Sequence, residues 1–416
     1  MTDELRTIDD LDVDGRRVLI RADLNVRITA PSAGWPVRVA DHSRVRAALT
    51  TFDELRRRGA RLVVVSHLDR PKGPDPGLSM QPVADRLGQL TGISVPLAPA
   101  VVGPAVRELT ERLEPGQMLV VENVRFEPGE TRNDPAMASA LAELADLYVN
   151  DAFASAHRDH ASTVGVAHLL PNAAGPEMER EVHALSALID RPARPLVALI
   201  GGAGTGERIS LVRRFLELGG LVCLGSEICA PFFAALGHGV GQSPCAPEDV
   251  ELASRVLSSA DGLRHQLLLP RDLVLARSTH ERGPVTRHLD GVEVPEGWMG
   301  YDIGSKTAFR YAAQIADAAT VFWNGPMGRF ELPQFDAGTR EIADAVASTT
   351  ATTVVAGAET IQALARFQAR DRVNHVCAGG RATLEFLEGR QLPGIQVLRT
   401  NGGAFNKRDA RARTVA

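Results

Sequence analysis

The chain has 416 residues, of which 44% are hydrophobic and 23% are charged, and its formal net charge is -5. This is ordinary globular composition, and the length corresponds to roughly two to three domains. The acidic balance argues against nucleic-acid binding, which needs a broad basic face. No apolar run approaches the ~20 residues of a membrane span, and the N-terminus, Met1-Thr2-Asp3-Glu4, lacks the features of a signal peptide.

Short apolar runs alternate with longer amphipathic runs through the first half of the chain. The expected strands are 18–20, 62–65, 118–121 and 147–149, and the expected helices include 43–58, 81–90 and 135–144. This rhythm predicts a parallel α/β architecture.

Basic residues follow the apolar runs of this half. They are Arg21, Arg44, His67 with Arg70, Arg125, and His157-Arg158 with His160. In open parallel sheets, ligands bind beyond the carboxyl ends of the strands. A local basic cluster on an acidic chain therefore predicts a pocket for a small anionic ligand.

A helical stretch at 177–190 and the Pro-bounded segment 191–195 interrupt the pattern, which is typical of a domain boundary. We expect a first lobe over 1–175, a connecting helix and hinge over 176–195, a second lobe over 196–395 and a tail over 396–416. The sequence does not show where the tail packs.

The second half repeats the strand–helix pattern. Strands are expected at 196–200, 221–224, 266–269, 320–323, 353–355 and 375–377, and helices at 209–218, 307–317 and 337–347. Glycine-containing turns follow five of these strands, at 201–206, 225–227, 323–328, 356–360 and 378–381. Glycine loops that open helices present bare N–H groups to phosphate. One such loop is explained by a tight turn alone, but five in one lobe favour a second anionic ligand.

All four cysteines, Cys223, Cys229, Cys245 and Cys377, lie in the second half. None forms a CxxC pair and no histidine stands at zinc spacing, so we interpret them as buried or free thiols in a reducing cytoplasm.

Several longer motifs resemble those of phosphoglycerate kinases. They are RADLNV at 21–26, SHLDRP at 66–71, ENVRF at 122–126, VNDAFASAHR at 149–158, DIGSKT at 302–307 and WNGPMGRFE at 323–331. The closing segments 387–389 and 392–394 also match the family pattern, so the resemblance runs from about residue 8 to residue 395.

The resemblance implies a monomeric two-lobed hinge enzyme of the α/β class, with two Rossmann-like three-layer lobes that have parallel sheets. Its first lobe would bind 3-phosphoglycerate, and closure of the lobes would allow phosphate transfer between a nucleotide and the acyl carboxylate. By resemblance, Asp23 and Asn25 hold the glycerate hydroxyl and carboxylate end. The phosphate and the reacting carboxylate would be bound by Arg44, His67, Arg70, Arg125 and Arg158.

For the second lobe, the resemblance implies a site for ATP or ADP with Mg²⁺. The nucleotide-binding positions are Gly202, Ala203, Arg208, Gly225, Asn324, Pro326, Glu331, Glu359 and Thr360. Glu359 would hold the metal. Arg44, Arg208, Gly379 and Gly380 would stabilise the transferring phosphoryl group.

This second lobe departs from the family pattern at several positions. The family's G-G-A-K-x-x-D-K loop reads GGAGTGER at 201–208, so that Gly204 replaces the first lysine and Arg208 the second. Glu227 replaces a glycine, Arg329 a small apolar residue and Glu359 the aspartate that engages Mg²⁺, and Arg381 enters the T-G-G-G-A loop.

These departures leave two hypotheses open. In the first, the site is retuned: Arg208 and Arg381 supply the charge that Gly204 removes, and Glu359 holds Mg²⁺ from one methylene further out. In the second, the protein binds a phosphorylated carboxylate without kinase chemistry. A pair between Glu227 and Arg329 inside the former adenine pocket would favour the second hypothesis.

Overall fold

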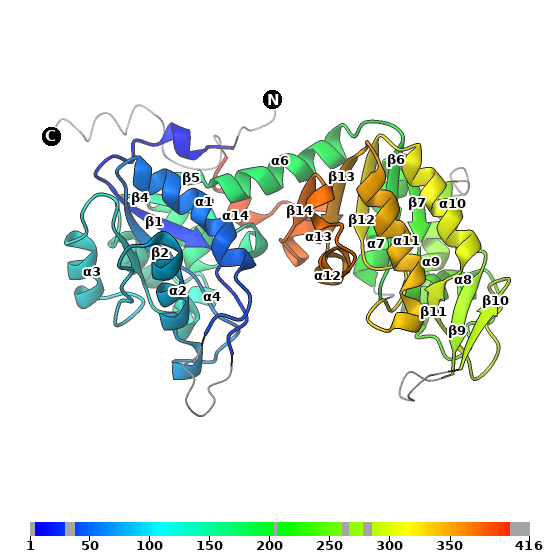
Figure 1. The fold of residues 1–416 in the computed structure, drawn as a ribbon. Helices are drawn as coiled ribbons and strands as arrows, with labels where there is room; N and C mark the ends of the chain where they lie inside the picture. The colour runs from blue at the N-terminus through cyan, green and yellow to red at the C-terminus, as the bar shows by residue number, and fades with distance from the viewer. Residues whose placement is uncertain (1–4, 30–37, 204–205, 260–265, 278–284, 400–416) are drawn as a thin grey trace. The chain divides into compact units, whose positions relative to one another are not determined.

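The computed structural model describes residues 5–29, 38–203, 206–259, 266–277 and 285–399. The chain forms two compact units, which can be followed in Figure 1 by the colour change from blue at the N-terminus to red at the C-terminus. The first unit contains the residues up to His183 and those from Gln391 onward, and the second contains Ala184–Arg390. The division lies within helix α6 (Pro176–Asp190), whereas the expected boundaries are at 175 and 195.

The first unit is built on a parallel sheet in the order β3-β2-β1-β4-β5. Its strands are β1 (Arg17–Ala22), β2 (Arg61–Val65), β3 (Met118–Val120), β4 (Leu147–Asp151) and β5 (Asn172–Ala174). Its helices are α1 (Ser43–Arg57), α2 (Gln81–Thr91), α3 (Pro104–Glu111), α4 (Pro128–Thr131), α5 (Pro135–Ala142), the start of α6, and α14 (Pro393–Gln396).

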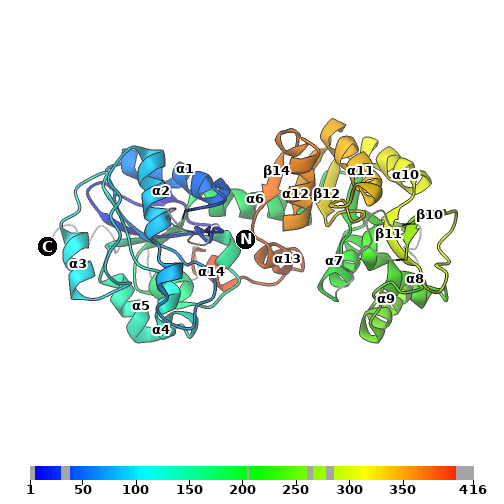
Figure 2. The same ribbon diagram turned by 60° about the horizontal axis from the view of Figure 1, so that its bottom comes forward.

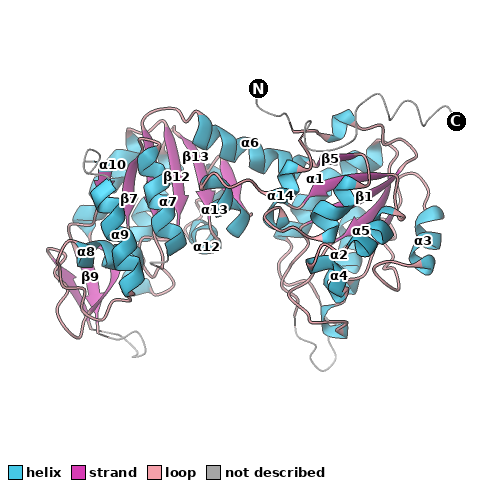
Figure 3. Ribbon diagram, turned by 180° about the vertical axis from the view of Figure 1, so that it is seen from behind, coloured by secondary structure: helices cyan, strands magenta, loops and turns pink. Residues whose placement is uncertain are grey.

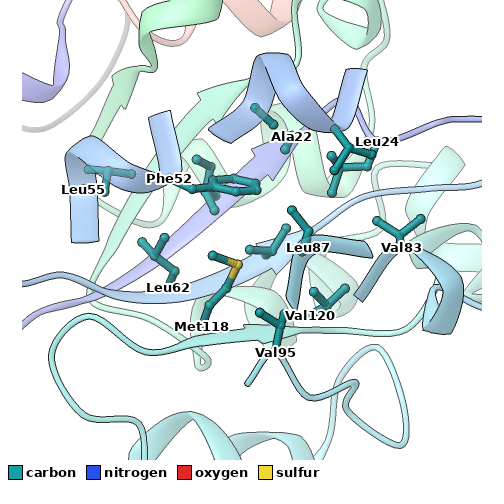
Figure 4. Close-up of a cluster of buried hydrophobic side chains, with 14 of the residues drawn as sticks. Ala22, Leu24, Phe52, Leu55, Leu62, Val83, Leu87, Val95, Met118 and Val120 are labelled. Carbon is teal, nitrogen blue, oxygen red and sulfur yellow. The ribbon is translucent and has the colours of Figure 1, made fainter. Parts of the chain in front are cut away.

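Successive side chains of each strand point to opposite faces of this sheet, so each strand packs against the layers on both sides of it. Val18 and Ile20 of β1 belong to a buried cluster that includes Phe52 of α1 and Leu87 of α2. Figure 4 shows this cluster, with Phe52 and Leu87 beside Leu62, Met118 and Val120. Tyr148 of β4 is also fully buried, and its hydroxyl donates 2.8 Å to the carbonyl of Ser162. The π-helical segment η5 (Ala161–Gly165) contains Ser162.

The second unit contains a six-stranded parallel sheet in the order β14-β13-β12-β6-β7-β8. Its strands are β6 (Leu196–Ile200), β7 (Leu221–Leu224), β8 (Leu267–Leu268), β12 (Thr320–Asn324), β13 (Thr352–Ala356) and β14 (His375–Cys377). Its helices are α7 (Gly206–Glu217), α8 (Cys229–Ala235), α9 (Pro247–Ser259), α10 (Ser305–Ala316), α11 (Ala337–Ser348), α12 (Ala358–Arg366) and α13 (Arg381–Leu387).

Helices cover both faces of this second sheet, as Figures 2 and 3 show. Trp323 of β12 packs in a cluster with Tyr311 of α10 and Ile342 of α11. The preceding side chain of the strand, Phe322, stacks on Phe215 of α7 with ring centroids 4.7 Å apart. The prediction of two α/β lobes with parallel sheets is confirmed.

The sequence analysis missed four strands. Three of them form an antiparallel sheet in the order β10-β9-β11: β9 (Leu273–Ala276), β10 (Thr286–Leu289) and β11 (Met299–Ile303). The fourth is β5, a three-residue strand that pairs with β4. β5 has only three residues and β10 is mostly exposed, so neither has the apolar run by which strands are recognised. β9 does have such a run, Leu273–Ala276, and that signal was overlooked.

The last described residues pack in the first unit. The amide of Gly394 donates to the carbonyl of Ala156 at 2.9 Å, and the amide of Arg6 donates to the carbonyl of Leu398 at 3.0 Å. The expected second lobe ends at 395, but Gln391–Arg399 lie with the first unit. In the described part of the chain, no helix is both long and apolar enough to cross a membrane.

Candidate active site

The predicted substrate residues of the first unit lie just beyond the carboxyl ends of its strands. Asp23 and Asn25 follow β1, His67 and Arg70 follow β2, Arg125 follows β3, and Arg158 follows β4. Arg44 lies in the first turn of α1. Because β1 to β4 are parallel neighbours, these residues share one edge of the sheet.

Asp23 and Arg44 form a direct ion pair. Arg44 Nη1 lies 2.7 Å from Oδ1 and 2.6 Å from Oδ2 of Asp23. The Arg44 side chain is 36% exposed, so solvent screens the pair. An anion that reached Arg44 could therefore compete with Asp23 for the guanidinium.

Asn25 and Arg125 fix the loop that carries Asp69 and Arg70. The side-chain oxygen of Asn25 accepts from the amide of Asp69 at 2.9 Å. Arg125 Nη1 donates to the carbonyl of the same residue at 2.7 Å. The loop after β2 is thus held from both sides, by a residue that follows β1 and a residue that follows β3.

The cations of this edge perturb one another electrostatically. Burial and the neighbouring Arg21, Arg158 and Arg70 lower the pKa of Arg125. Burial and the positive charges nearby, Arg21 first, lower the pKa of His67 well below its usual value. His67 is therefore neutral near pH 7. Asp23 pairs with Arg44 and Glu130 interacts with Arg21, whereas Arg125 lies among cations that lower its pKa. Such concentrated positive charge favours an anionic ligand.

Not every basic residue at this edge is available to a ligand. Arg21 is only 2% exposed, and its guanidinium donates to Ser162 Oγ, the carbonyl of Ala22 and His67 Nδ1. His160 is also buried, and its Nδ1 lies 3.5 Å from Glu130 Oε1. Both residues are part of the support of the site.

In the second unit, the predicted nucleotide residues also follow strand ends. Gly202 and Ala203 follow β6, Gly225 follows β7, Asn324 ends β12 and precedes Pro326, and Gly379 and Gly380 follow β14. Glu359 and Thr360 open α12, directly after β13. Glu331 is exposed, and its carbonyl lies 3.4 Å from Arg366 Nη1.

Two of the turns approach each other so closely that only glycine fits. A Cβ on Gly325, whose φ is +92°, would lie 2.1 Å from the carbonyl oxygen of Gly201. The amide of Gly202 donates to the carbonyl of Pro326 at 3.0 Å. The contact joins the turns after β6 and β12.

Thr360 and Asn324 surround the start of α12. Thr360 Oγ1 accepts from the amide of Gly325 at 2.7 Å. A Cβ on Gly357 would lie 3.1 Å from Asn324 Nδ2 and 3.3 Å from Thr360 Oγ1. A side chain at position 357 would therefore be crowded, and the φ of +93° also favours glycine there.

Arg208 and Glu359, both predicted site residues, face each other. Arg208 Nη2 lies 3.5 Å from Glu359 Oε2, and Nη1 donates to the carbonyl of Ala203 at 3.3 Å. The guanidinium lies over Gly202, where an added Cβ would be 2.0 Å from Nη1. Arg208 is thus positioned at the turn after β6, and it competes with any cation for Glu359.

Arg381 is directed toward acidic partners. Its Nε lies 2.8 Å from Glu385 and its Nη2 lies 3.6 Å from Glu207. Glu385 and Glu207 raise the pKa of Arg381. Gly380, which precedes it, has a φ of +57°. Gly204, the position of the replaced lysine, falls outside the described residues.

Glu227 and Arg329 form an ion pair, the contact that would favour the second hypothesis. Arg329 Nη2 and Nε lie 2.6 Å and 3.2 Å from Glu227 Oε1. The guanidinium also lies 5.3 Å from the centroid of the Tyr301 ring. Glu227 lines a pocket together with Ser226, Phe233, Leu273, Val294 and Asp302. Glu227, one member of the pair, therefore lies at the wall of a largely apolar pocket.

Three residues of these sites escaped the sequence analysis: Glu130, Ser162 and Tyr301. Glu130 and Ser162 are 32 positions apart and meet only in the folded unit. Tyr301 stands one position before the 302–307 motif, which is the signal that could have found it.

Comparison with known proteins assigns the family. The family model "Phosphoglycerate kinase" matches residues 8–390. Phosphoglycerate kinases of Desulforudis audaxviator and Rubrobacter xylanophilus are each 44% identical to the chain, over 94% of its length and 98% of theirs. The phosphoglycerate kinase structure from Coxiella burnetii superposes with a TM-score of 0.84 at 35% identity, over 95% of this chain and 99% of that one. The structure from Pyrococcus horikoshii gives 0.80 at 26% identity, over 95% and 98%. The chain belongs to the phosphoglycerate kinase family.

Proposed function

We propose that the protein transfers a phosphoryl group between a nucleotide and the carboxylate of 3-phosphoglycerate. The observation that carries the proposal is the set of basic residues at the carboxyl edge of the first sheet. Arg44 and Arg125 lie close enough to His67 for their charges to lower its pKa. The names of the relatives support the same activity.

The first unit supplies the acceptor site. Guanidinium groups form paired hydrogen bonds to phosphate and carboxylate oxygens. Arg125, Arg70 and Arg158 would bind the phosphate and carboxylate, and Asp23 and Asn25 would orient the hydroxyl end. Arg44 would release Asp23, bind the anionic ligand in its place and approach the phosphoryl group that is transferred.

The second unit supplies the donor site. The turns at Gly357 and Gly379–Gly380 would present backbone N–H groups to the phosphates, and Arg208 would add a positive charge. The turns at Gly202 and Gly225, whose own amides donate to the carbonyls of Pro326 and Ile200, would shape the site. Positioned charge of this kind is the main source of catalysis in phosphoryl transfer.

Glu359 would hold Mg²⁺ together with nucleotide phosphates. The fit is reasonable because Mg²⁺ is usually bound through one or two carboxylates plus substrate phosphates, and Glu359 is 54% exposed in the first turn of α12. When bound, the metal would neutralise phosphate charge. Arg208 must then release Glu359, which frees its guanidinium for the phosphates.

We further propose that the protein is a cytoplasmic monomer, and that its two units close around both ligands and exclude water during transfer.

A coupled assay with ATP, Mg²⁺ and 3-phosphoglycerate tests the proposed activity. We expect turnover that depends on all three components and falls at least tenfold in Arg125→Gln, because the substituted amide lacks the positive charge. A rate equal to that of the enzyme-free blank would contradict the proposal.

The Glu227–Arg329 pair favours a second candidate function, a phosphoglycerate-binding protein that lacks kinase activity. The pair occupies the positions where the family has a glycine and a small apolar residue. A nucleotide base that enters here must displace a charged pair or pack beside it. Calorimetry separates the candidates: the second requires 3-phosphoglycerate binding with no nucleotide binding at millimolar concentration.

Removal of both charges should improve nucleotide binding. In the double variant Glu227→Gly/Arg329→Val, we expect the Kd for ADP to decrease about tenfold, which corresponds to about 1.4 kcal/mol. The single change Arg329→Val should help less, because it leaves Glu227, with a side chain 17% exposed, without its partner.

The matched control is Arg255→Val, which breaks the exposed pair with Glu251 on α9. Its Kd should equal that of the wild type. An unchanged Kd in the double variant would show that the pair does not obstruct the base.

A further inference from the structure

A buried chain of hydrogen bonds leads from Glu130 to His67 in the first unit. Glu130 Oε1 accepts from Ser162 Oγ at 2.6 Å, and Oε2 accepts from the Ser162 amide at 2.9 Å. Ser162 Oγ in turn accepts from Arg21 Nε at 3.0 Å. Arg21 Nη2 lies 2.9 Å from His67 Nδ1. All four side chains are buried.

The donors in this chain determine the tautomer of His67. A guanidinium has only N–H donors and cannot accept a hydrogen bond. Nδ1 of His67 must therefore be the acceptor, so the neutral ring carries its proton on Nε2. Burial and the charge of Arg21 lower the pKa of His67, which excludes the doubly protonated ring near pH 7.

Glu130 balances the buried charge of Arg21. An isolated charge in a protein interior is strongly unfavourable. Burial alone would raise the pKa of Glu130, but His160, Arg21 and Ser162 together lower it, so the carboxylate is ionised. The pair is linked through the hydroxyl of Ser162, which fixes the orientation of the guanidinium as well as its charge.

Each of the three guanidinium nitrogens of Arg21 already has a partner within the protein. Nε donates to Ser162, Nη1 donates to the carbonyl of Ala22 at 2.7 Å, and Nη2 donates to His67. With 2% exposure, it acts through its neighbour and does not contact an anion itself.

We propose that Arg21, anchored by Ser162 and Glu130, is a positioning residue that fixes His67 as the Nε2-protonated tautomer, so that the imidazole donates to the phosphorylated ligand. The proposal rests on the proposed function for the identity of the ligand. It assigns His67 the role of a neutral donor among cations, whereas Arg125 and Arg158 contribute charge.

The test combines NMR of the ring nitrogens with calorimetry on the full-length protein. In the wild type, ¹⁵N chemical shifts should show an unprotonated Nδ1 and a protonated Nε2 for His67. In Ser162→Ala, Arg21 loses the acceptor of its Nε. We expect His67 to populate both tautomers, and 3-phosphoglycerate to bind about tenfold more weakly, the effect of one lost hydrogen bond.

The control is Ser139→Ala, the same change at an exposed serine of α5. It should leave both the shifts and the Kd unchanged. The wild-type spectrum keeps the test decisive even where Ser162→Ala folds poorly, because the tautomer is read without any substitution.

A protonated Nδ1 in the wild type overturns the positioning role, and so does an unchanged tautomer and Kd in Ser162→Ala. Failure of the wild type to bind 3-phosphoglycerate is a different outcome. It overturns the proposed function and the ligand contact, while the tautomer still reports on Arg21 separately.

Discussion

Replacement of Gly204 by lysine should raise kcat for transfer between ATP and 3-phosphoglycerate by about a hundredfold. The family carries a lysine at this position of the loop after β6, and here the residue is glycine. A positioned charge near the moving oxygens is typically worth about two to three decades in rate. Arg208 lies at the same turn, on the carbonyl of Ala203, so we expect the lower end of this range.

Steady-state kinetics with both substrates saturating measures this change. The control is Ser258→Lys, which adds the same charge at an exposed position of α9, and it should leave kcat unchanged. An unchanged kcat in Gly204→Lys would mean that another residue already supplies the charge. In that case Arg208→Gln should lose about a hundredfold, which identifies Arg208 as the replacement.

Asp151→Asn should raise the free energy of unfolding relative to the wild type, and this gain should be about 3 kcal/mol larger at pH 8 than at pH 5. Asp151 ends β4, and its Oδ1 accepts from the amides of Glu177 and Met178 at the start of α6. Its Oδ2 is buried, and beyond the two amides the Thr51 hydroxyl is the one side-chain hydrogen-bond partner of this carboxyl among the described residues. Burial raises the pKa of Asp151 to about 7.

The direction follows from proton binding. Between the unfolded pKa near 3.8 and the folded pKa near 7, the folded protein holds a proton that the unfolded chain has released. The contribution of Asp151 to the free energy of unfolding is therefore fully present below the unfolded pKa and is lost as pH rises through 7. Asparagine has no such proton, keeps the oxygen that caps α6, and its NH₂ can donate to the oxygen of the Thr51 hydroxyl, the side-chain partner of this carboxyl.

Urea unfolding at pH 5, 6.5 and 8 measures the effect as the difference between variant and wild type. This difference isolates Asp151 from His67, whose lowered pKa makes the protein less stable as pH falls below 6.5. Asp12→Asn, at an exposed carboxylate, should show no pH-dependent difference. A difference that stays flat from pH 5 to 8 would contradict the raised pKa.

The same change at Asp302 should not stabilise the protein. Burial raises the pKa of Asp302 to about 8. However, Oδ2 accepts from the amide of Gly338 and Oδ1 from the amide of Ile303. An asparagine there would direct its NH₂ at a backbone donor, and this repulsion offsets the gain from removing the charge.

The sequence by itself determined the parallel α/β class, because strand and helix periodicities are local properties of the chain. It also placed the basic residues at the strand ends of the first unit and the glycine turns at the strand ends of the second, because parallel strands bring their carboxyl ends to one edge of each sheet. The family motifs are also short stretches of consecutive residues that can be read directly from the sequence. The comparisons confirm the family that these motifs indicate.

Only the tertiary structure decided which of these residues are partners. Arg21 belongs to the same sequence pattern as Arg44. In the structure, however, Arg21 is buried and donates to Ser162, whereas Arg44 is half-exposed and pairs with Asp23. The return of residues 391–399 to the first unit and the Arg208–Glu359 contact also join positions far apart in the chain. The physical reason is the same in each case: charge, burial and hydrogen bonding depend on distances in space, which residue spacing along one sequence does not specify.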